Sequence, residues 1–171
     1  GLRYEPYGQN GWWYEVQLKL ARKLIFSKWK EALGGNLDLI ASGSAALQPR
    51  LARVFTAAGM TVAEGYGLTE TSPVISVNDM RNKKLRIGSV GTVISRVSVK
   101  IAKDGEILCK GPNVMLGYYK DEEKTKEVIK DGFFHTGDIG HIDSEGFLKI
   151  TDRKKEMFKT SGGKYIAPQV I

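Results

Sequence analysis

The first long pattern in the chain is an apolar repeat at helical spacing over residues 12–33. Val16, Leu20 and Leu24 recur every four residues, and lysines and arginines fill many of the other positions, which predicts an amphipathic helix. A pair of glycines follows and is typical of a helix C-cap. The favoured interpretation is a helix that packs its apolar face on the core and exposes its lysines. The alternative is a basic helix that lies on a membrane surface.

The next segment alternates strands with a helix. It predicts a strand at 37–42, a small-residue turn at 43–46, a helix at 48–58, and strands at 61–63 and 74–77. Strands that alternate with helices favour a parallel or mixed sheet. Ligands of such sheets bind outside the carboxyl ends of the strands, so we expect both the small-residue turn and the loop after the third element to lie at that edge.

That loop carries the densest set of chemically useful residues. Gly65 and Gly67 flank Tyr66, and Thr69 and Glu70 follow. Glycines allow positive φ and close approach of a ligand, and a carboxylate is a hard ligand that Mg²⁺ accepts beside phosphates. These residues are compatible with a nucleotide-phosphate loop and equally with an ordinary glycine-rich turn.

From about residue 85 the pattern changes to short alternating runs. Asp104 and Gly105 separate two such runs within 91–110, which is a strong hairpin signal. A short charged helix over 121–130 precedes further strands up to residue 151. We therefore expect an α/β fold of mixed α+β character, in which an antiparallel, barrel-like β subdomain follows the strand–helix–strand portion.

A charged break at the DRKK sequence marks a boundary. Together with the change of pattern near residue 85, this boundary divides the chain into three parts. They are an α/β portion at 1–84, the β subdomain at 85–151 and the start of a small further domain at 152–171.

Composition narrows the class of protein without selecting a ligand. The chain has 171 residues, of which 42% are hydrophobic and 26% charged, and its net charge is +7. The basic residues are scattered, so we expect no nucleic-acid partner. The single cysteine, Cys109, cannot form an internal disulfide and is interpreted as a small buried hydrophobe. A reducing, cytoplasmic location is expected, with peripheral attachment to a membrane as a further expectation.

Four motifs follow one another in a specific order. They are the GYGLTE sequence at 65–70, the GPNVMLGYY sequence at 111–119, the HTGD sequence at 135–138, and the DRKKE sequence at 152–156 with the lysine and glycine pair beyond it. In this order they closely resemble the AMP-forming acyl-CoA synthetases of the acyl-adenylate superfamily. The sequence over 64–77 and 159–165 is most similar to that of the long-chain fatty acid–CoA ligases. The resemblance implies an enzyme of fatty acid metabolism whose small-molecule substrates are ATP, a fatty acid and coenzyme A.

The resemblance also implies roles for individual residues. Tyr66 would stack on adenine against a wall of small residues, Thr69 would contact the α-phosphate, and Glu70 would hold Mg²⁺. Asp138 would accept hydrogen bonds from the ribose hydroxyls, which suits a carboxylate, and Arg153 would reach the ribose or the phosphate. The small-residue wall and the remaining nucleotide contacts would be Gly43, Ser44, Ala45, Ala46, Gly65 and Gly67.

Further roles fall near the end of the chain. Asp152 and Lys155 would form the hinge about which a carboxyl-terminal domain rotates, and Lys159, Gly162 and Gly163 would face the active site in the thioester-forming state. Each residue also has a plainer interpretation: Asp138 as a turn aspartate, Arg153 as a surface charge. His135 is interpreted as a strand-end residue, because nothing in the sequence pairs with it as a base would require.

Two elements of the family pattern are missing from the 171 residues. There is no Ser/Thr/Gly-rich phosphate loop with a lysine before residue 64, and no late catalytic lysine. Phosphoryl chemistry depends on charge stabilisation at the phosphates. We therefore expect a piece of a longer ligase that is inactive alone, retains weak AMP binding and self-associates through apolar surface. A related enzyme with another acyl substrate and a basic binding module without catalysis are the alternatives.

Overall fold

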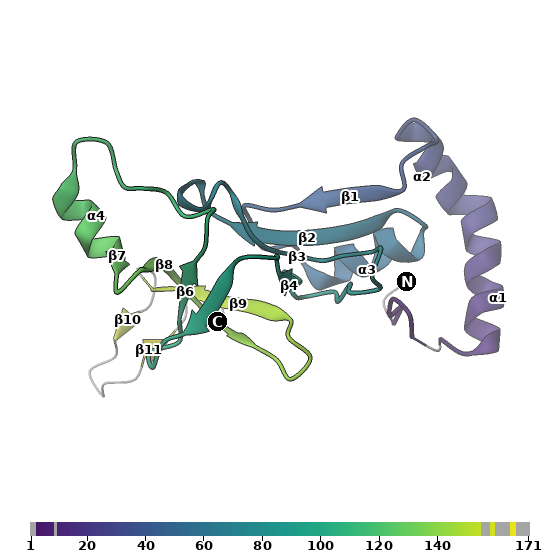
Figure 1. Cartoon of the computed structure of the whole chain (residues 1–171). Helices are drawn as coiled ribbons and strands as arrows, with labels where there is room; N and C mark the ends of the chain where they lie inside the picture. Colours follow the sequence, from purple (N-terminus) through teal and green to yellow (C-terminus); the bar gives the residue numbers. More distant parts are fainter. Residues whose placement is uncertain (1–2, 9, 155–157, 160–164, 167–171) are drawn as a thin grey trace.

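The computed structural model describes residues 3–8, 10–154, 158–159 and 165–166. Figure 1 shows the arrangement of the elements, with the amino-terminal helical segment at one end and the short helix α4 at the other. In chain order the elements are α1 Trp12–Ala21, η1 Arg22–Phe26, α2 Ser27–Ala32, β1 Leu39–Ser42, α3 Pro49–Ala57, β2 Thr61–Gly67, η2 Thr69–Thr71, β3 Val74–Val77, β4 Thr92–Val93, β5 Ser98–Ile101, β6 Glu106–Lys110, α4 Glu122–Val128, β7 Ile129–Lys130, β8 Phe133–Ile142, β9 Leu148–Arg153, β10 Phe158–Lys159 and β11 Tyr165–Ile166.

The first sheet has four strands in the order β1-β2-β3-β4. β1 and β2 are parallel, and the other two pairs are antiparallel, so the predicted mixed sheet is confirmed. Helix α3 begins at Pro49, where proline is tolerated in the first turn. Its buried Ala52 packs with Val62 of β2 and with Leu85 and Ile87 from the loop after β3.

The second sheet has five antiparallel strands in the order β5-β6-β8-β7, with β9 also paired to β8. The predicted Asp104–Gly105 hairpin joins β5 to β6, and Gly105 has the positive φ of 86° that such a turn requires. The expected antiparallel β unit is therefore confirmed, and its described strands form an open sheet.

A shared apolar core joins the two sheets. Tyr66 and Ile75 from the first sheet pack with Ile107, Cys109 and Leu148 from the second, and all five are buried. Cys109 is thus the buried hydrophobe that the sequence predicted.

The main chains of the two sheets also meet directly. The Leu148 nitrogen donates to the Gly91 carbonyl at 2.8 Å, and the Val90 nitrogen donates to the Leu148 carbonyl at 3.0 Å. Gly91 is required here, because its φ is +83° and a Cβ would lie 2.0 Å from the Val77 carbonyl carbon.

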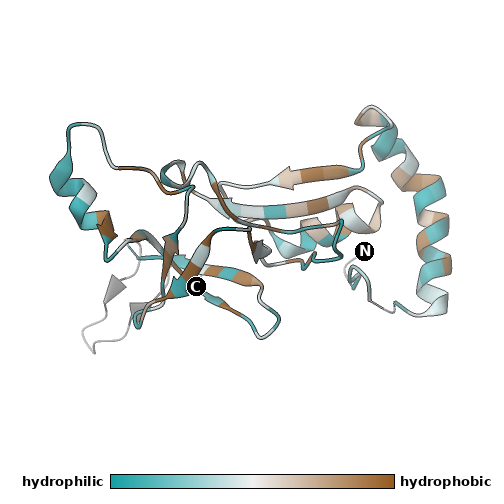
Figure 2. Cartoon of the chain, in the orientation of Figure 1, coloured by the Kyte–Doolittle hydropathy of each residue, from teal (hydrophilic) through white to brown (hydrophobic). Residues whose placement is uncertain are grey.

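The amino-terminal helical segment differs from its prediction in packing. The helix is present over α1, η1 and α2, but Leu18 is its only buried residue among those described. Figure 2 shows apolar positions spread along this segment. Large apolar side chains are exposed on it, so the expectation that its apolar face packs on the core is wrong for most of that face. The exposed residues are Trp12, Trp13, Val16, Leu20, Leu24, Ile25, Trp29 and Leu33.

Two further differences concern element boundaries. β2 extends from Thr61 through Gly67, so Gly65, Tyr66 and Gly67 lie in a strand where a loop was expected. β4 pairs with β3, which carries the first sheet beyond residue 85, and the proposed domain division stays a prediction. None of the helices in the described part of the chain combines the length and apolarity that a bilayer-spanning segment requires.

Candidate functional site

Residues of both sheets line a cavity of about 470 Å³. Its walls combine the small-residue turn after β1, the end of β2, the loop that leads to β4, and the strands β8 and β9 where they pair. The lining residues are Ser42, Ser44, Ala45, Ala46, Leu47, Pro49, Glu64, Gly65, Tyr66, Gly67, Leu68, Gly88, Ser89, Val90, Asp138, Ile150, Thr151, Asp152 and Arg153.

Three polar side chains in this cavity bond to one another. The Tyr66 hydroxyl donates to Oδ2 of Asp138 at 2.7 Å, and the Arg153 Nε lies 3.3 Å from Oδ1 of the same carboxylate. Burial raises the pKa of Tyr66, and the neighbouring Asp138 raises it further, so the phenol stays a donor. A carboxylate has about four acceptor positions, so Asp138 can still accept hydrogen bonds from ligand hydroxyls.

The position of Tyr66 depends on the glycine that follows it. β2 pairs with β3 through a register shift between Tyr66 and Gly67. At Gly67 a Cβ would lie 1.6 Å from the Pro73 carbonyl oxygen, so only glycine permits this close approach. Gly65 has no such conflict, since its nearest atom would be the Ser76 carbonyl oxygen at 3.4 Å.

The predicted small-residue wall is present. Ser44, Ala45 and Ala46 line the cavity, and Ser44 takes a φ of 65°. Gly43 is not among the lining residues, but a Cβ there would come within 3.6 Å of the Gly65 carbonyl oxygen. The short side chains leave space on the side of the cavity formed by this turn.

Thr69 and Glu70 are placed outside the lining of this cavity. They begin the short helix η2, and Glu70 Oε1 accepts a hydrogen bond from the Tyr118 hydroxyl at 2.8 Å. The described residues contain no group of three metal-ligating side chains. A single carboxylate still fits Mg²⁺, because that ion is often held by one or two carboxylates together with substrate phosphates.

The hinge and carboxyl-terminal predictions are only partly visible. Asp152 lines the cavity and is 8% exposed, and its Oδ2 has no hydrogen-bond partner among the described residues. Lys155, Gly162 and Gly163 lie outside the described residues. Lys159 pairs with Tyr165 between β10 and β11, and its side chain is likewise outside them.

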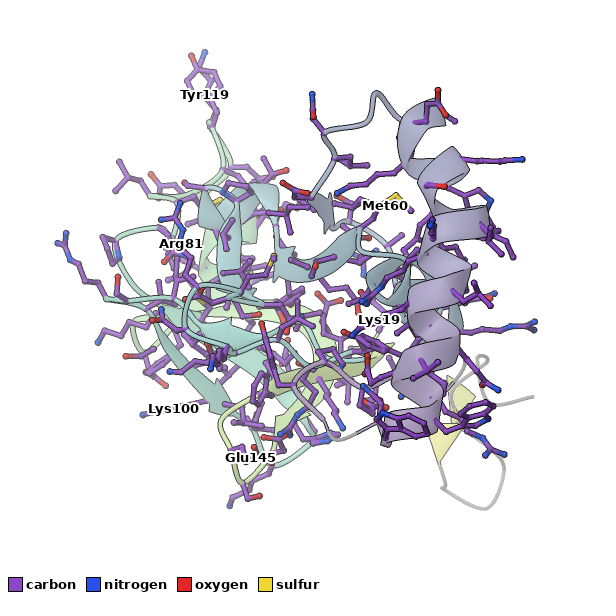
Figure 3. The ribbon with its side chains drawn as sticks, turned by 90° about the vertical axis from the view of Figure 1, so that its right-hand side faces the viewer. Lys19, Met60, Arg81, Lys100, Tyr119 and Glu145 are labelled. Atoms are coloured by element: carbon purple, nitrogen blue, oxygen red, sulfur yellow. The ribbon has the colours of Figure 1, made fainter. Side chains whose placement is uncertain are left out.

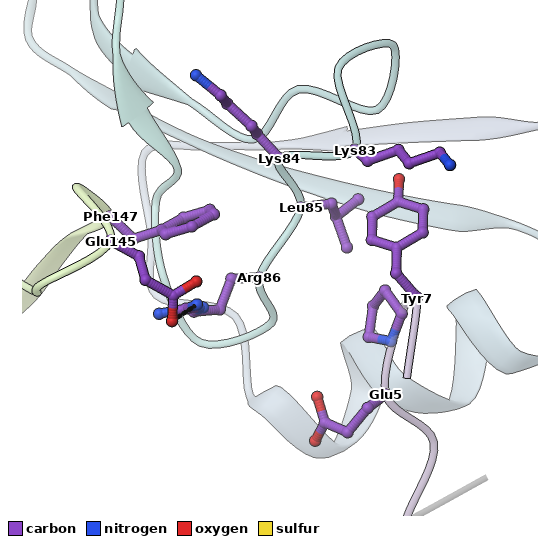
Figure 4. Close-up of a pocket in the computed structure, with 9 residues that line it drawn as sticks. Glu5, Tyr7, Lys83, Lys84, Leu85, Arg86, Glu145 and Phe147 are labelled. Carbon is purple, nitrogen blue, oxygen red and sulfur yellow. Dashed lines mark ion pairs between the residues drawn. The ribbon is translucent and has the colours of Figure 1, made fainter. Parts of the chain in front are cut away.

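A second cavity of about 480 Å³ lies elsewhere on the chain (Figure 4). Its Arg86 is already paired with Asp143 and Glu145, and the guanidinium carbon stands 4.2 Å from the centre of the Phe147 ring. These contacts give the arginine a structural role, and they leave the first cavity as the candidate site.

Sequence reasoning missed one residue, Glu106, that bonds to neighbours of the lining residues from behind. Glu106 is 4% exposed on β6, and its carboxylate bonds to Lys154 and to the Gly137 main chain. Its partner Lys154 lies within the DRKKE sequence, but no motif marked Glu106. The available signal was a charged residue directly after the hairpin turn, at the start of a strand whose next residue is buried.

Comparison with known proteins is consistent with this geometry. Residues 13–119 match the model of a family described as AMP-binding enzyme. The chain is 45% identical over 149 residues to long-chain-fatty-acid–CoA ligase FadD15 of Mycobacterium bovis, and the match covers 87% of this chain and 24% of that relative. It is 43% identical over 162 residues to long-chain-fatty-acid–CoA ligase 5 of Rattus norvegicus, with 87% and 23% covered. The chain thus spans about a quarter of the length of these curated relatives.

Two solved structures with a similar fold each contain a bound nucleotide. The o-succinylbenzoate CoA synthetase of Bacillus subtilis in complex with AMP gives a TM-score of 0.69 at 28% identity, covering 84% of this chain and 33% of that one. An ATP-bound chimera named RpMatB-BxBclM gives 0.73 at 35% identity, covering 82% and 30%.

Proposed function

The chain belongs to the AMP-binding enzyme family, and on that premise we propose that it forms the adenylate-binding part of an ATP-dependent, AMP-forming long-chain fatty acid–CoA ligase. In the proposed reaction a fatty acid carboxylate attacks the α-phosphate of ATP and releases pyrophosphate. The thiol of coenzyme A then attacks the acyl carbon and displaces AMP. The substrate class rests on the names of the most similar relatives.

One observation carries the nucleotide part of this proposal. The cavity joins an aromatic ring, a wall of small residues and a buried carboxylate bonded to an arginine, through Tyr66, Ala45, Asp138 and Arg153. The flat, small-residue wall suits a purine base, and the carboxylate suits the paired hydroxyls of a ribose. Arg153, 60% exposed at its side chain, suits a phosphate.

The remaining roles are proposals of the same kind. Thr69 and Glu70 would meet the phosphates and Mg²⁺, which requires the nucleotide to extend from the cavity toward η2. Mg²⁺ would offset charge on the phosphates when bound. Asp152 would act at a hinge, and Lys159 would act in the second step, together with Lys155 and the Gly162–Gly163 pair.

Titration of the chain with AMP tests the nucleotide site. Asp138→Asn should weaken AMP binding by at least tenfold, because an NH₂ donor group replaces one of the two acceptor oxygens of the carboxylate. Asp131→Asn is the matched control, since Asp131 is exposed and asparagine tolerates its φ of 52°. An equal response of the wild type to AMP and to inorganic phosphate contradicts the proposal.

We further propose that the 171 residues bind the nucleotide without completing the ligase reaction. The sequence holds no lysine-bearing phosphate loop before residue 64, and such cationic elements supply much of the rate in phosphoryl chemistry. Incubation with ATP, coenzyme A and palmitate should give no acyl-CoA. Formation of palmitoyl-CoA by the isolated chain contradicts this part alone.

Two alternatives stand beside this proposal, and the Asp138→Asn variant distinguishes the second of them. A related ligase with another acyl substrate would bind AMP in the same way and differ in the acid that it accepts. A basic interaction module would bind duplex nucleic acid in a salt-sensitive manner, and Asp138→Asn would leave that binding unchanged.

The exposed apolar face of the first helical segment supports two further proposals, self-association of the chain and attachment to a cytoplasmic membrane surface. Trp12, Val16, Leu20 and Leu24 form an exposed ridge at four-residue spacing, and Lys19 and Lys23 are exposed near it. Flotation with vesicles of phosphatidylcholine and phosphatidylserine tests attachment. Sedimentation equilibrium without lipid tests self-association. Leu20→Glu should abolish whichever occurs.

A further inference from the structure

Glu106 is the most extensively bonded buried carboxylate in the described residues. Oε1 accepts from the Gly137 nitrogen at 3.0 Å, and Oε2 accepts from the Lys154 Nζ at 2.9 Å and lies 3.1 Å from the His135 Nδ1. The side chain is 6% exposed. None of these partners lines the cavity, but Gly137 and Lys154 each directly neighbour a lining residue in sequence.

The first of these bonds stabilises an irregularity in β8. Glu106 pairs with Ile139 and Leu108 pairs with His135, so residues 136–138 of β8 lie opposite the single residue Ile107. Bulges of this kind redirect a side chain beside an active site. Asp138, the last residue of this bulge, accepts the hydrogen bond from the Tyr66 hydroxyl.

The bulge needs partners for its main-chain groups, since unbonded buried amides are costly. Glu106 takes the Gly137 amide, and Gly137 has the φ of 75° that the bulge imposes. The Thr136 hydroxyl accepts from the Asp138 nitrogen at 3.1 Å and donates to the Ile107 carbonyl at 2.8 Å. Of the two side chains that bond to these main-chain groups, Glu106 is the one that also bonds to Lys154 after β9, among the described residues.

The second bond holds the end of β9. Lys154 directly follows Arg153, and Arg153 pairs in register with Asp138. Lys154 also meets the Asp104 carboxylate at 2.8 Å. One carboxylate on β6 therefore contacts the residue before Asp138 and the residue after Arg153.

The charges support this arrangement. Burial alone would raise the pKa of Glu106, but hydrogen bonds from Lys154, His135 and Gly137 outweigh it and lower that pKa. Asp104 and Glu106 together raise the pKa of Lys154. The carboxylate and the ammonium are both charged at neutral pH, where such bonds are strongest.

We propose that Glu106 is a positioning residue of the nucleotide cavity, which sets the Asp138–Arg153 pair in place from behind by bonding to Gly137 and Lys154. The ligand in question rests on the proposed function, namely the ribose and phosphate of AMP. The geometric part concerns only the chain itself. Glu106 touches no ligand and acts through its neighbours.

The test compares Glu106→Gln with Asp104→Asn. Glutamine keeps the size of the side chain and loses the charge that faces Lys154 and Gly137. Asp104 pairs with the same lysine but does not contact β8, so Asp104→Asn controls for loss of a carboxylate partner. We expect Glu106→Gln to weaken AMP binding about tenfold, and Asp104→Asn to change it less than about threefold.

Amide hydrogen exchange supplies a readout that needs no ligand. In Glu106→Gln the Gly137 and Asp138 amides should exchange at least tenfold faster, while the Val62 amide in the first sheet should keep its protection. A merely structural role would accelerate both regions in proportion to the loss of global stability, which urea unfolding measures.

The outcomes distinguish a failure of the positioning role of Glu106 from a failure of the proposed nucleotide binding. Unchanged exchange at Gly137 and Asp138 overturns the inference, as does AMP affinity equal to that of Asp104→Asn. If the wild-type chain binds no AMP, the proposed function fails, and the exchange comparison alone then decides the positioning role. Glu106→Asp, which is shorter but charged, should recover part of the protection.

Discussion

The two sheets each bury a glutamate, and the pKa values of the two carboxyl groups shift in opposite directions. Glu64 on β2 is 8% exposed and Glu106 on β6 is 4% exposed. Burial raises the pKa of Glu64, and main-chain donors, including the Gly88 amide at 3.4 Å, only partly offset it. The pKa of Glu106 is lowered despite burial, because Lys154 and His135 bond to it.

The difference shows that depth of burial alone does not determine the direction in which the pKa of a carboxyl group shifts. Desolvation acts on both glutamates and favours the neutral form. Among the described residues, the cation that bonds to either carboxylate is Lys154, and it bonds to Glu106 in the second sheet, because the residue after β9 comes to β6 there. The first sheet forms its side of the cavity with small residues and closely approaching main chains. The second sheet forms its side with charged side chains.

The largest expected effect is at the glycine that joins the two regions. Gly91→Ala should cost roughly 3–5 kcal/mol of unfolding free energy, because the Cβ meets the Val77 main chain and φ is positive. Gly146→Ala is the matched control, with a φ of 85° and nothing within 4 Å of the added Cβ. It should cost only about 1 kcal/mol. Urea unfolding measures both, and equal costs contradict the steric explanation.

Neutral substitution of the two glutamates should have effects of opposite sign. At pH 7 Glu106→Gln should lower the free energy of unfolding by about 1–2 kcal/mol, because Lys154 and Gly137 lose a charged hydrogen-bond acceptor. Glu64→Gln should stabilise by about 0.5–1 kcal/mol, because an amide avoids burying a charge. Chemical denaturation measures the change in free energy of unfolding for each variant. A change of the same sign in both variants would contradict the proposed difference between the two glutamates.

The pH dependence should also be opposite, with a size near 1 kcal/mol. The lowered pKa of Glu106 gives stability that is present above the ordinary glutamate pKa and lost as pH falls through the folded-state value. The raised pKa of Glu64 gives stability that is present below the ordinary value and lost as pH rises. Unfolding from roughly pH 3 to 8 should therefore show the cost of Glu106→Gln shrinking at low pH and the gain from Glu64→Gln growing at high pH.

A further effect, of a size similar to that at Glu64, concerns the bond that links the sheets through side chains. Tyr66→Phe removes the 2.7 Å donor to Asp138 and should cost about 0.5–1.5 kcal/mol. Tyr119→Phe is the control, because Tyr119 projects from the rest of the chain (Figure 3) and is 88% exposed. Thermal unfolding distinguishes them, and a neutral Tyr66→Phe would mean that the hydroxyl bond adds nothing to stability.

Much of the fold follows from local sequence. Pro49 and the apolar spacing after it predict α3, the Asp104–Gly105 pair predicts its hairpin, and the alternating runs predict the antiparallel sheet. The ordered motifs predicted the family, which the match over residues 13–119 confirms. The cavity joins Tyr66, Ser44, Ala45, Ala46, Asp138 and Arg153 as the resemblance implied. Their roles toward a nucleotide remain predictions.

The tertiary structure decided what depends on distant partners. Gly65 and Gly67 belong to a strand because β3 pairs alongside them, and local glycine content alone favoured a loop. Glu106 bonds to a lysine 48 residues away, and that contact exists only once β6, β8 and β9 have their register. Turns, periods and caps are set by neighbours in sequence, so the sequence by itself determined them. Burial and ion pairing are set by neighbours in space, so only the folded sheets could decide the opposite pKa shifts of Glu64 and Glu106.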